Sequence, residues 1–518
     1  MTAQRDKRKE TDGVALADQD MKAAIAVTRF GLGARPGEID QARRDPQGFL
    51  KGQIRRSGAD QPAGASPTSA QRMAEFREYQ RERRELRVEK ASDVRAPKPA
   101  GATMDAADPA MAAVAKSDVR DPVKVVGNML RKDISEDFAA RIQLASATDA
   151  GFRERWTLFW ANHFTVSATK AITGTVVGPF EEEAIRPHVF GRFDDLLGAA
   201  ETHPAMLTYL DQIQSIGPDS DAARAMRNGG GPRGVGGVGG ARLQQAALQR
   251  TPGLNENLAR EIMELHTVGV NGGYTQADVT EFARAMTGIS IGGERDGAYG
   301  APVFRVQAHE PGERTVMGVR YDQRGKEQAN AILSDLAAKP QTARFICTKL
   351  ARHFVADDPP PALVARLEAA WIGSRGDLAT VAEALVSAPE AWDPTAAKFK
   401  TPYEFIVSSY RAAGGTPMGF QQVGPIMTSL GQKPFSAPSP KGWPEDAQSW
   451  AAPDAIVKRM QFAQAFSAGA VHDRDPKALA ADALGERLGP DTAKAIARAE
   501  SRPEGFALLL MSPEFQRR

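Results

Sequence analysis

The sequence is poor in cysteine, with a single thiol, Cys347, in 518 residues. One cysteine excludes an internal disulfide and any zinc or iron–sulfur site built from several thiolates. A bound metal would need histidine, carboxylate and carbonyl ligands, and the sequence has only seven histidines. Cys347 lies in an amphipathic helical pattern, where a lone thiol is typical of a small core residue.

The sequence also lacks an excess of charge of one sign and any long apolar run. Its 66 basic and 64 acidic side chains leave a formal net charge of +2. This balance gives no broad field for steering nucleic acid, so we expect no nucleic-acid partner. Residues 1–20 are charged and lack the apolar stretch of a signal peptide, and no later segment reads as a transmembrane helix. As it stands, the sequence predicts a cytoplasmic protein.

Familiar catalytic signatures are missing as well. There is no HExxH, no paired ExxH of a di-iron bundle, no GxSxG and no Walker A sequence. The run GGVGG has neither the spacing nor the strand and helix context of a dinucleotide loop. The sequence therefore indicates no reaction type, no cofactor and no metal identity, and it leaves open whether the protein is an enzyme.

What the sequence does contain is helical periodicity, at an ordinary 42% hydrophobic and 25% charged residues. It predicts a mainly α fold: a large multi-helix body with one small β-hairpin and long loops rich in Gly and Pro. In the hairpin, APVFRVQ and RTVMGVRYD are expected to be two strands separated by AHEPGE. The expected segments are a charged tail at 1–20, a helical segment at 21–56, a low-complexity insertion with a charged, solvated helix at 57–120, and a main body at 121–518 containing a Gly-rich loop at 212–252, the hairpin at 301–322 and a Pro-rich loop at 414–453.

The most informative stretch begins near Leu254. Read as a helix, 254–268 places Leu254, Leu258, Ile262 and Leu265 on one side and polar residues on the other. The polar candidates for a site on this stretch are Asn257, Arg260, Glu261 and Glu264, with His266 toward the apolar side. We expect the rest of the molecule to cover the polar side, so its charges must be paired, because an isolated buried ion is very costly. Just downstream, Thr275 and Asp278 are predicted to form a capping box.

Four further candidates lie in earlier helical segments. His163 ends an aromatic stripe and is either a hydrogen-bonded core residue or a group facing a pocket. Pro187 is expected to end a helix and to place Arg186 and His188 at its exit, where such charges also commonly cap helices. His203 precedes Pro204, which suits the first turn of a helix.

The Pro-rich loop contains Phe435 and Trp443 among prolines. Such aromatic residues either line a groove or pack the loop onto the helical body, and packing is the commoner use. The Gly-rich loop is expected to be a surface loop, and whether it is a lid stays open.

Motifs along nearly the whole chain carry a family resemblance. They are TRFGLGARPGE, FWANHFTVS, IRPHVFGRFDDLL, HPAMLTYLDQ, GLNENLAREIMELHTVGVNGGYTQADVTEFARAMTG, TARFICTKLARHFVADDPP, LGQKPF, GWPED and SPEFQRR. With them the chain resembles the bacterial domain-of-unknown-function family 1800. It departs from the family pattern at Ile289, Glu310 and Arg314. The changes at Glu310 and Arg314 preserve charge, which keeps His309 and Glu310 as further polar candidates.

The resemblance implies a mostly helical fold but carries no activity, cofactor or catalytic residue. It also implies a neighbour in the genome from domain-of-unknown-function family 1501, a group resembling sulfatases and phosphatases. It further implies export, if the N-terminus has been trimmed or miscalled. Our first hypothesis is a pocket of His, Glu and Arg side chains that binds or processes a small molecule or polymer end, with a metal site as a sub-case. The alternative is a noncatalytic scaffold or assembly partner of a family 1501 protein.

Overall fold

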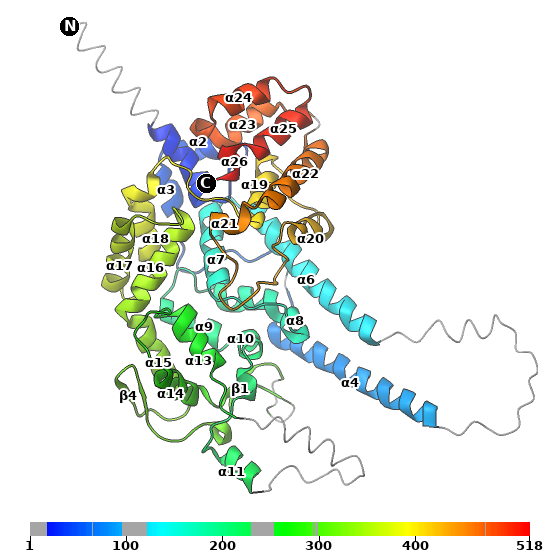
Figure 1. Ribbon diagram of the computed structural model, residues 1–518, viewed down its shortest axis with the longest axis vertical. Helices are drawn as coiled ribbons and strands as arrows, with labels where there is room; N and C mark the ends of the chain where they lie inside the picture. The colour runs from blue at the N-terminus through cyan, green and yellow to red at the C-terminus, as the bar shows by residue number, and fades with distance from the viewer. Residues whose placement is uncertain are drawn as a thin grey trace, which may run out of the picture.

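The computed structural model describes residues 18–64, 66–95, 122–228, 253–293, 296, 299–471 and 473–518. These residues are mainly helical, which confirms the fold class expected from the sequence. Figure 1 shows two groups of helices stacked along the long axis, with the C-terminal group at one end.

The helix α7 (Gly151–His163) lies at the centre of the larger group and is buried on nearly all sides. Phe152, Trp156 and Trp160, spaced four residues apart, are all 0% exposed. The indole of Trp156 stacks on the ring of Phe190 at a centroid distance of 5.9 Å, and its Nε1 donates to the carbonyl of Val189 at 2.7 Å. The aromatic stripe seen in the sequence is therefore the axis of the core.

The larger hydrophobic core is built around α7 by helices from residues 18 to 392. After a helical stretch at 18–25, its elements are η1 (Ala26–Phe30), α2 (Glu38–Arg43), α3 (Pro46–Lys51), α4 (Ser69–Arg95), α8 (Ala171–Phe180), η2 (Glu181–Ile185), α9 (Phe193–Glu201), α10 (Pro204–Tyr209), η3 (Gln212–Gln214), α13 (Asn257–Glu261), η4 (Ile262–His266), α14 (Gln276–Met286), α15 (Lys326–Ala338), α16 (Pro340–Phe354), α17 (Pro361–Ser374), α18 (Leu378–Ser387) and η7 (Pro389–Trp392). Cys347 is buried in α16, as its pattern predicts.

A second core joins α6 to the C-terminal helices. Its elements are α6 (Pro122–Ala147), α19 (Pro402–Ala412), α20 (Phe420–Ser429), α22 (Pro453–Ala470), α23 (Pro476–Leu484), η8 (Gly485–Arg487), α24 (Pro490–Ala497), α25 (Arg502–Met511) and α26 (Pro513–Gln516). Three short helices lie outside both cores: α11 (Asp221–Arg227), η6 (Val306–Ala308) and α21 (Ala447–Trp450).

Many of these helices begin with a proline that follows a polar cap, because a first-turn residue needs no amide hydrogen bond. The hydroxyl of Thr401 caps α19 and the carboxylate of Glu404 returns the bond. The predicted capping box of Thr275 and Asp278 at α14 is confirmed. These caps explain why the helix starts were readable from the sequence.

Three segments, η1, η2 and η4, form single π-helical turns. Wider turns of this kind are uncommon and frequently occur at functional sites. Both η1 and η2 pack against α7. In η4, the hydroxyl of Thr267 donates to the carbonyl of Ile262 at 2.7 Å, which closes the wide turn.

The strands pair differently from the prediction. Strand β2 (Pro302–Phe304) pairs with β1 (Ile289–Ile291), which directly follows α14. The hairpin lies within RTVMGVRYD alone, where β3 (Arg314–Val316) turns into β4 (Val319–Tyr321). The turn residues Met317 and Gly318 both have positive φ, which suits a two-residue hairpin turn.

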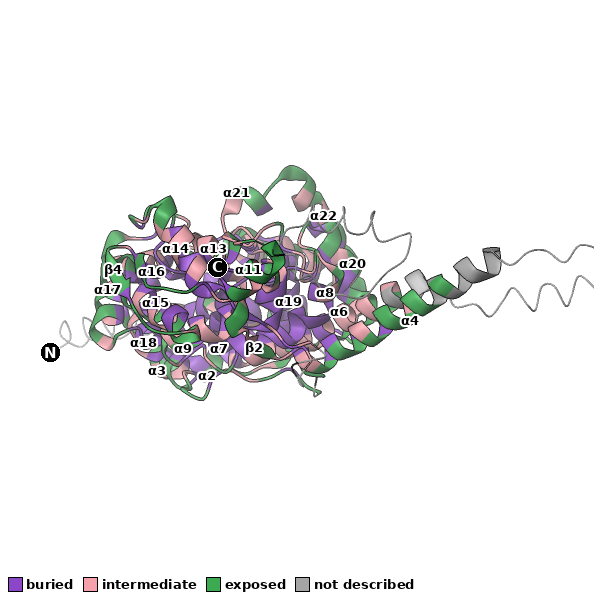
Figure 2. Cartoon of the chain, turned by 90° about the horizontal axis from the view of Figure 1, so that it is seen from below, coloured by how far each residue is buried: buried purple, intermediate pink, exposed green. Residues whose placement is uncertain are grey.

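Two segments expected to be loops contain helices where they are described. The segment 414–453 holds α20 and α21, and the segment 212–252 holds η3 and α11; its Gly-rich part at 229–252 lies outside the described residues. The charged helix α4 is confirmed as a helix, but Met73, Phe76 and Tyr79 bury one face of its first half. Figure 2 shows α4 and α6 leaving the body together, with exposed residues along α4.

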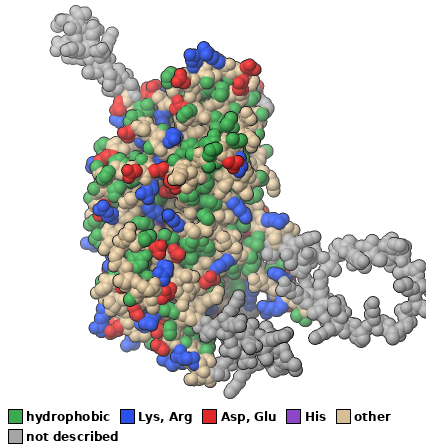
Figure 3. Space-filling model, viewed as in Figure 1, with side chains coloured by type: hydrophobic (Ala, Val, Ile, Leu, Met, Phe, Trp, Pro, Cys, Tyr) green, Lys and Arg blue, Asp and Glu red, His purple; other side chains and the backbone are tan. Residues whose placement is uncertain are grey.

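Charges of both signs are interspersed over the face shown in Figure 3, without a patch of one sign. Among the described residues, none of the helices is both long and apolar enough to span a bilayer.

We expect Trp156→Ala to lower the free energy of unfolding by about 3 to 5 kcal/mol, because it leaves a cavity in the core and an unpaired carbonyl at Val189. Urea denaturation followed by circular dichroism measures the loss. Ile372→Ala, at a side chain that is 52% exposed, is the control and should change stability by less than about 0.5 kcal/mol. Equal effects of the two substitutions would contradict a core centred on α7.

Candidate functional site

The structure brings two of the sequence candidates together, His163 at the end of α7 and His266 at the end of η4. Their ring centroids lie 5.7 Å apart, and Nε2 of His163 lies 3.2 Å from the carbonyl oxygen of His266. Nζ of Lys349, on α16, lies 2.8 Å from Nδ1 of His163. Since a protonated amine only donates, Nδ1 of His163 accepts a hydrogen bond from Lys349. Nε2 of His163 therefore carries the ring proton and donates to the carbonyl oxygen of His266.

Burial lowers the pKa of His163 well below its usual value, and Lys349 and His266 lower it further. Burial also lowers the pKa of Lys349, to about 8. His163 is therefore a neutral imidazole at neutral pH. Of the two roles considered for His163 from the sequence, its contacts are those of a hydrogen-bonded core residue.

A further carboxylate, Glu201 at the end of α9, faces His266. Both side chains are 0% exposed, and Oε1 of Glu201 lies 2.7 Å from Nδ1 of His266, at ion-pair distance but away from the direction of a linear hydrogen bond. Nε2 of His266 has no partner among the described residues. Nothing in the sequence near Glu201 marked it as the partner of His266, because 65 positions separate the two.

Arg186 lies in a different cluster. Its guanidinium makes two 2.8 Å hydrogen bonds to Glu154 on α7 and one of 2.7 Å to Glu181, the first residue of η2. Burial opposes the charge of Arg186, but the two carboxylates outweigh it and raise its pKa. Arg186 also acts on Glu181. Burial raises the pKa of Glu181, but Arg141 and Arg186 outweigh burial and lower it. This cluster ties α7 to η2.

The remaining histidines of the first hypothesis lie apart from this cluster. His203 caps α10, with Nδ1 accepting from the amide of Ala205 at 3.1 Å and Nε2 at 2.9 Å from Glu183. His188 is half-buried in the turn after Pro187. The position of His203 matches the helix start read from its proline, and its contacts are structural.

The part of the chain that the structure describes covers the polar side of α13 and η4 only in part, whereas full cover was expected from the sequence. Asn257 is exposed, and Arg260, Glu261 and Glu264 are intermediate in exposure. Arg260 pairs with Glu256 at 3.0 Å. The helix packs on α14 through its apolar side, which leaves the polar side facing outward. Burial raises the pKa of Glu261, and His266 acts in the opposite direction.

His309 and Glu310 hold a loop in place. Nδ1 of His309 lies 2.8 Å from the carbonyl of Thr287, and Oε2 of Glu310 accepts from the amide of Asp219 at 2.7 Å. The single converging pocket of the first hypothesis therefore does not form from these residues. Within the described ranges, no group of three or more His, Cys, Asp or Glu side chains is arranged to hold a metal ion.

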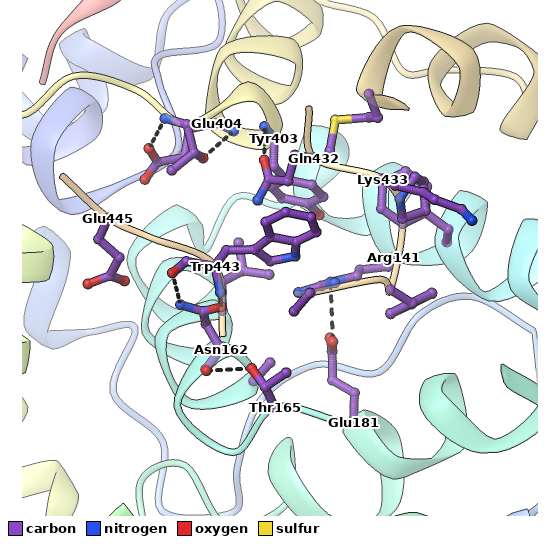
Figure 4. A pocket seen from close by; sticks show the side chains of 18 of the residues that line it. Arg141, Asn162, Thr165, Glu181, Tyr403, Glu404, Gln432, Lys433, Trp443 and Glu445 are labelled. Carbon is purple, nitrogen blue, oxygen red and sulfur yellow. Dashed lines mark hydrogen bonds and ion pairs between the residues drawn. The ribbon is translucent and has the colours of Figure 1, made fainter. Parts of the chain in front are cut away.

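A pocket lies elsewhere, between α6, α7, α8 and α19 and the segment 432–445 (Figure 4), with a cavity volume of about 110 Å³. Six of the family motifs contribute to it, among them TRFGLGARPGE with Leu32 and SPEFQRR with Arg518. FWANHFTVS supplies Ala161, Asn162, Thr165 and Val166; TARFICTKLARHFVADDPP supplies His353; LGQKPF supplies Gln432 to Phe435; GWPED supplies Trp443 to Glu445.

The segment 432–445 is fixed to α7 by a two-way amide contact. The side chain of Asn162 donates to the carbonyl of Trp443 at 3.0 Å and accepts from its amide at 2.8 Å. Gly442 permits this approach: its φ is +87°, and a Cβ there would lie 2.4 Å from the carbonyl oxygen of Asn162. Figure 4 shows the indole of Trp443 pointing into the pocket from this anchor.

Phe435 is held in an unusual conformation at the pocket wall. Its φ is +48°, a region that bulky residues avoid, and its carbonyl accepts from the amide of Ala168 at 2.8 Å. Strained residues of this kind cluster at functional sites. Both aromatic residues of the Pro-rich loop thus line a groove, the less common of the two uses considered from the sequence.

A histidine and a carboxylate lie together at one end of the pocket. Nδ1 of His353 is 2.5 Å from Oε1 of Glu445, and Nε2 of His353 is buried without a partner in the described part of the chain. Burial lowers the pKa of His353 despite the charge of Glu445. A neutral imidazole oriented by a carboxylate through Nδ1 can accept a proton at Nε2. Sequence reasoning missed this pair, although both residues lie in quoted family motifs.

The chain belongs to the family described as "Protein of unknown function (DUF1800)", whose model matches residues 25–517. This near full-length match confirms the resemblance seen in the motifs. No curated protein and no solved structure matches the chain.

Removing the charge of Arg186 should be strongly destabilising. We expect Arg186→Met to lower the free energy of unfolding by about 3 to 5 kcal/mol, because it leaves Glu154 and Glu181 buried without a counter-charge. Urea denaturation tests this, with Arg192→Met as the control. Arg192 is paired with Asp194 at the surface, and its loss should cost less than about 1 kcal/mol.

His163 should make stability depend on pH. Its pKa in the folded protein lies below the unfolded value, so the unfolded chain binds a proton first as the pH falls below about 6.5. Stability is therefore lost toward acid, by up to about 1.4 kcal/mol per pH unit. We expect urea midpoints between pH 7 and pH 5 to fall less steeply in His163→Gln than in the wild type. Parallel curves would show that His163 is protonated in the folded protein.

Proposed function

We propose that this member of the DUF1800 family binds a small molecule in the pocket between α7 and the segment 432–445. The observation that carries the proposal is the convergence of six separate family motifs on one cavity. In a mainly helical protein, residues far apart in sequence gather around a concave space most readily where a ligand is held.

The architecture of the pocket wall supports a binding role. A polar anchor from Asn162, a glycine that allows close approach and a strained Phe435 all hold the segment 432–445 in one conformation. Positioning of this kind reduces the entropy that would be lost when a ligand orders its site.

The pair of His353 and Glu445 gives the pocket a group suited to proton transfer. Because Nε2 of His353 has no partner among the described residues, its lone pair is not used by the fold. We infer that a ligand bound beside this pair is exposed to acid–base chemistry, while the reaction itself stays open.

The scaffold alternative, with a family 1501 protein as partner, stays a prediction. It rests on the family resemblance and on two contact elements: the charged helix α4, and the Gly-rich loop, which lies outside the described residues at 229–252. Binding of a partner protein that is abolished by deletion of 221–241 but unchanged in a pocket variant would favour that alternative.

The pocket proposal is tested by filling the cavity. Ala161, on α7, lines the pocket, and Ala161→Leu should weaken the binding of any fragment held there by about tenfold or more, equivalent to about 1.4 kcal/mol. Saturation-transfer NMR with a panel of small ring compounds, followed by calorimetric titration of each hit, measures the change.

The matched control is Ala331→Leu, at a similarly half-buried alanine on α15 outside the pocket. It should leave every hit unchanged. A panel in which no compound binds the wild type, or in which Ala161→Leu binds as well as the control, would count against the proposal.

A further inference from the structure

The free polar groups that line the pocket, away from His353 and Glu445, can all donate a hydrogen bond. Oη of Tyr403 is buried and has no partner in the described structure. The side-chain oxygen of Gln432 already accepts from the amide of Tyr403 at 2.8 Å, which leaves the Gln432 amide nitrogen as the free end. Figure 4 shows Tyr403, Gln432 and Trp443 grouped on the same side of the cavity.

Arg141 adds a cation at this end. Its Nε lies 3.2 Å from Oε2 of Glu181, and its guanidinium carbon lies 5.2 Å from the centroid of the Tyr403 ring and 5.4 Å from that of Phe435. The other oxygen of Glu181 accepts from Arg186 at 2.7 Å. Since both oxygens of Glu181 are engaged, the outer nitrogens of Arg141 are the part of this pair that a ligand can use.

The other carboxylates of the pocket are engaged as well. Glu404 is shared between Arg155 and Arg518, and Glu445 pairs with His353. The donor end therefore presents one guanidinium and several neutral donors to the cavity. A ligand that meets all of them must be rich in acceptors, and a carboxylate does so while matching the two outer nitrogens of a guanidinium.

The size and walls of the cavity limit the rest of the ligand. Aromatic side chains of Phe138, Phe180, Phe435 and Trp443 line it. One water-sized group occupies about 10 to 15 Å³ of cavity volume. The cavity volume of about 110 Å³ therefore holds roughly ten non-hydrogen atoms. This is the size of one ring with a short substituent, and a flat ring suits aromatic walls.

Resting on the proposed binding function, we propose that the pocket takes a small cyclic carboxylate, with its carboxylate at Arg141, Tyr403 and Gln432 and its ring against Trp443. A monoanion fits better than a phosphate dianion, because a second buried negative charge would need a second cation. Lys433 does not supply one: it is exposed, and in Figure 4 its side chain points away from the pocket.

Calorimetric titration tests the inference with benzoate and cyclohexanecarboxylate as carboxylate probes, benzamide and cyclohexanecarboxamide as neutral counterparts, and inorganic phosphate. We expect at least one carboxylate to bind about tenfold or more tightly than its neutral counterpart, a difference of about 1.4 kcal/mol. The two carboxylates separate a flat aromatic ring from a puckered ring.

Two variants locate the carboxylate. Arg141→Gln should weaken carboxylate binding about tenfold or more and reduce the preference over the neutral probe. Tyr403→Phe should weaken the same binding about fivefold and leave the urea midpoint unchanged or higher, because Oη has no partner in the described structure. Lys441→Gln is the control, a charge change in the same segment but outside the cavity.

The outcomes separate the two proposals. Neutral probes that bind as well as the carboxylates, phosphate that binds more tightly than they do, or unchanged carboxylate binding in Tyr403→Phe would overturn the carboxylate inference. If Ala161→Leu still removes binding of the neutral probes, the pocket itself stands. If no probe binds the wild type, both proposals fail.

Discussion

The constraint on which the rest of the structure depends is the nearly complete burial of α7, a helix that carries charged residues. Arg153, Glu154, Arg155 and His163 are all nearly inaccessible to solvent. An unpaired ion in such surroundings would cost more than the fold gains from any single contact, so each needs a partner from another element. Asp60 meets Arg153, Arg186 meets Glu154, and Glu404 meets Arg155. These pairs decide which elements can surround α7.

The pocket follows from the same arrangement. The polar pairs at the start of α7 attach the helix to the N-terminal segment, η2 and α19, and Asn162 near its other end attaches the segment 432–445. Between these attachments lies a space whose walls are aromatic and whose carboxylates are already paired. His163 follows Asn162 on α7 and contacts Lys349, and His266 of η4 lies beside His163 and faces Glu201.

Sequence reasoning identified helices, caps and family motifs, and it failed where a partner came from a distant segment. The polar side of α13 was expected to be covered, but α13 packs by its apolar side and leaves Arg260 and Glu264 partly exposed. His163 and His266 were both candidates, yet their contact passes through a backbone carbonyl and a lysine that no spacing rule connects. LGQKPF and GWPED were noticed as motifs, but local pattern does not show which face of a loop meets a helix.

The sequence by itself determined the helical class, the helix starts with their proline and capping residues, the burial of Cys347 and the family, because these depend on periodicity and on contacts between neighbours in the chain. Only the tertiary structure decided where the site lies. Tyr403, Arg141, His353 and Glu445 come from four elements, and they share one cavity because the buried charges of α7 bring those elements together. Such long-range pairing leaves no local signal in the order of residues.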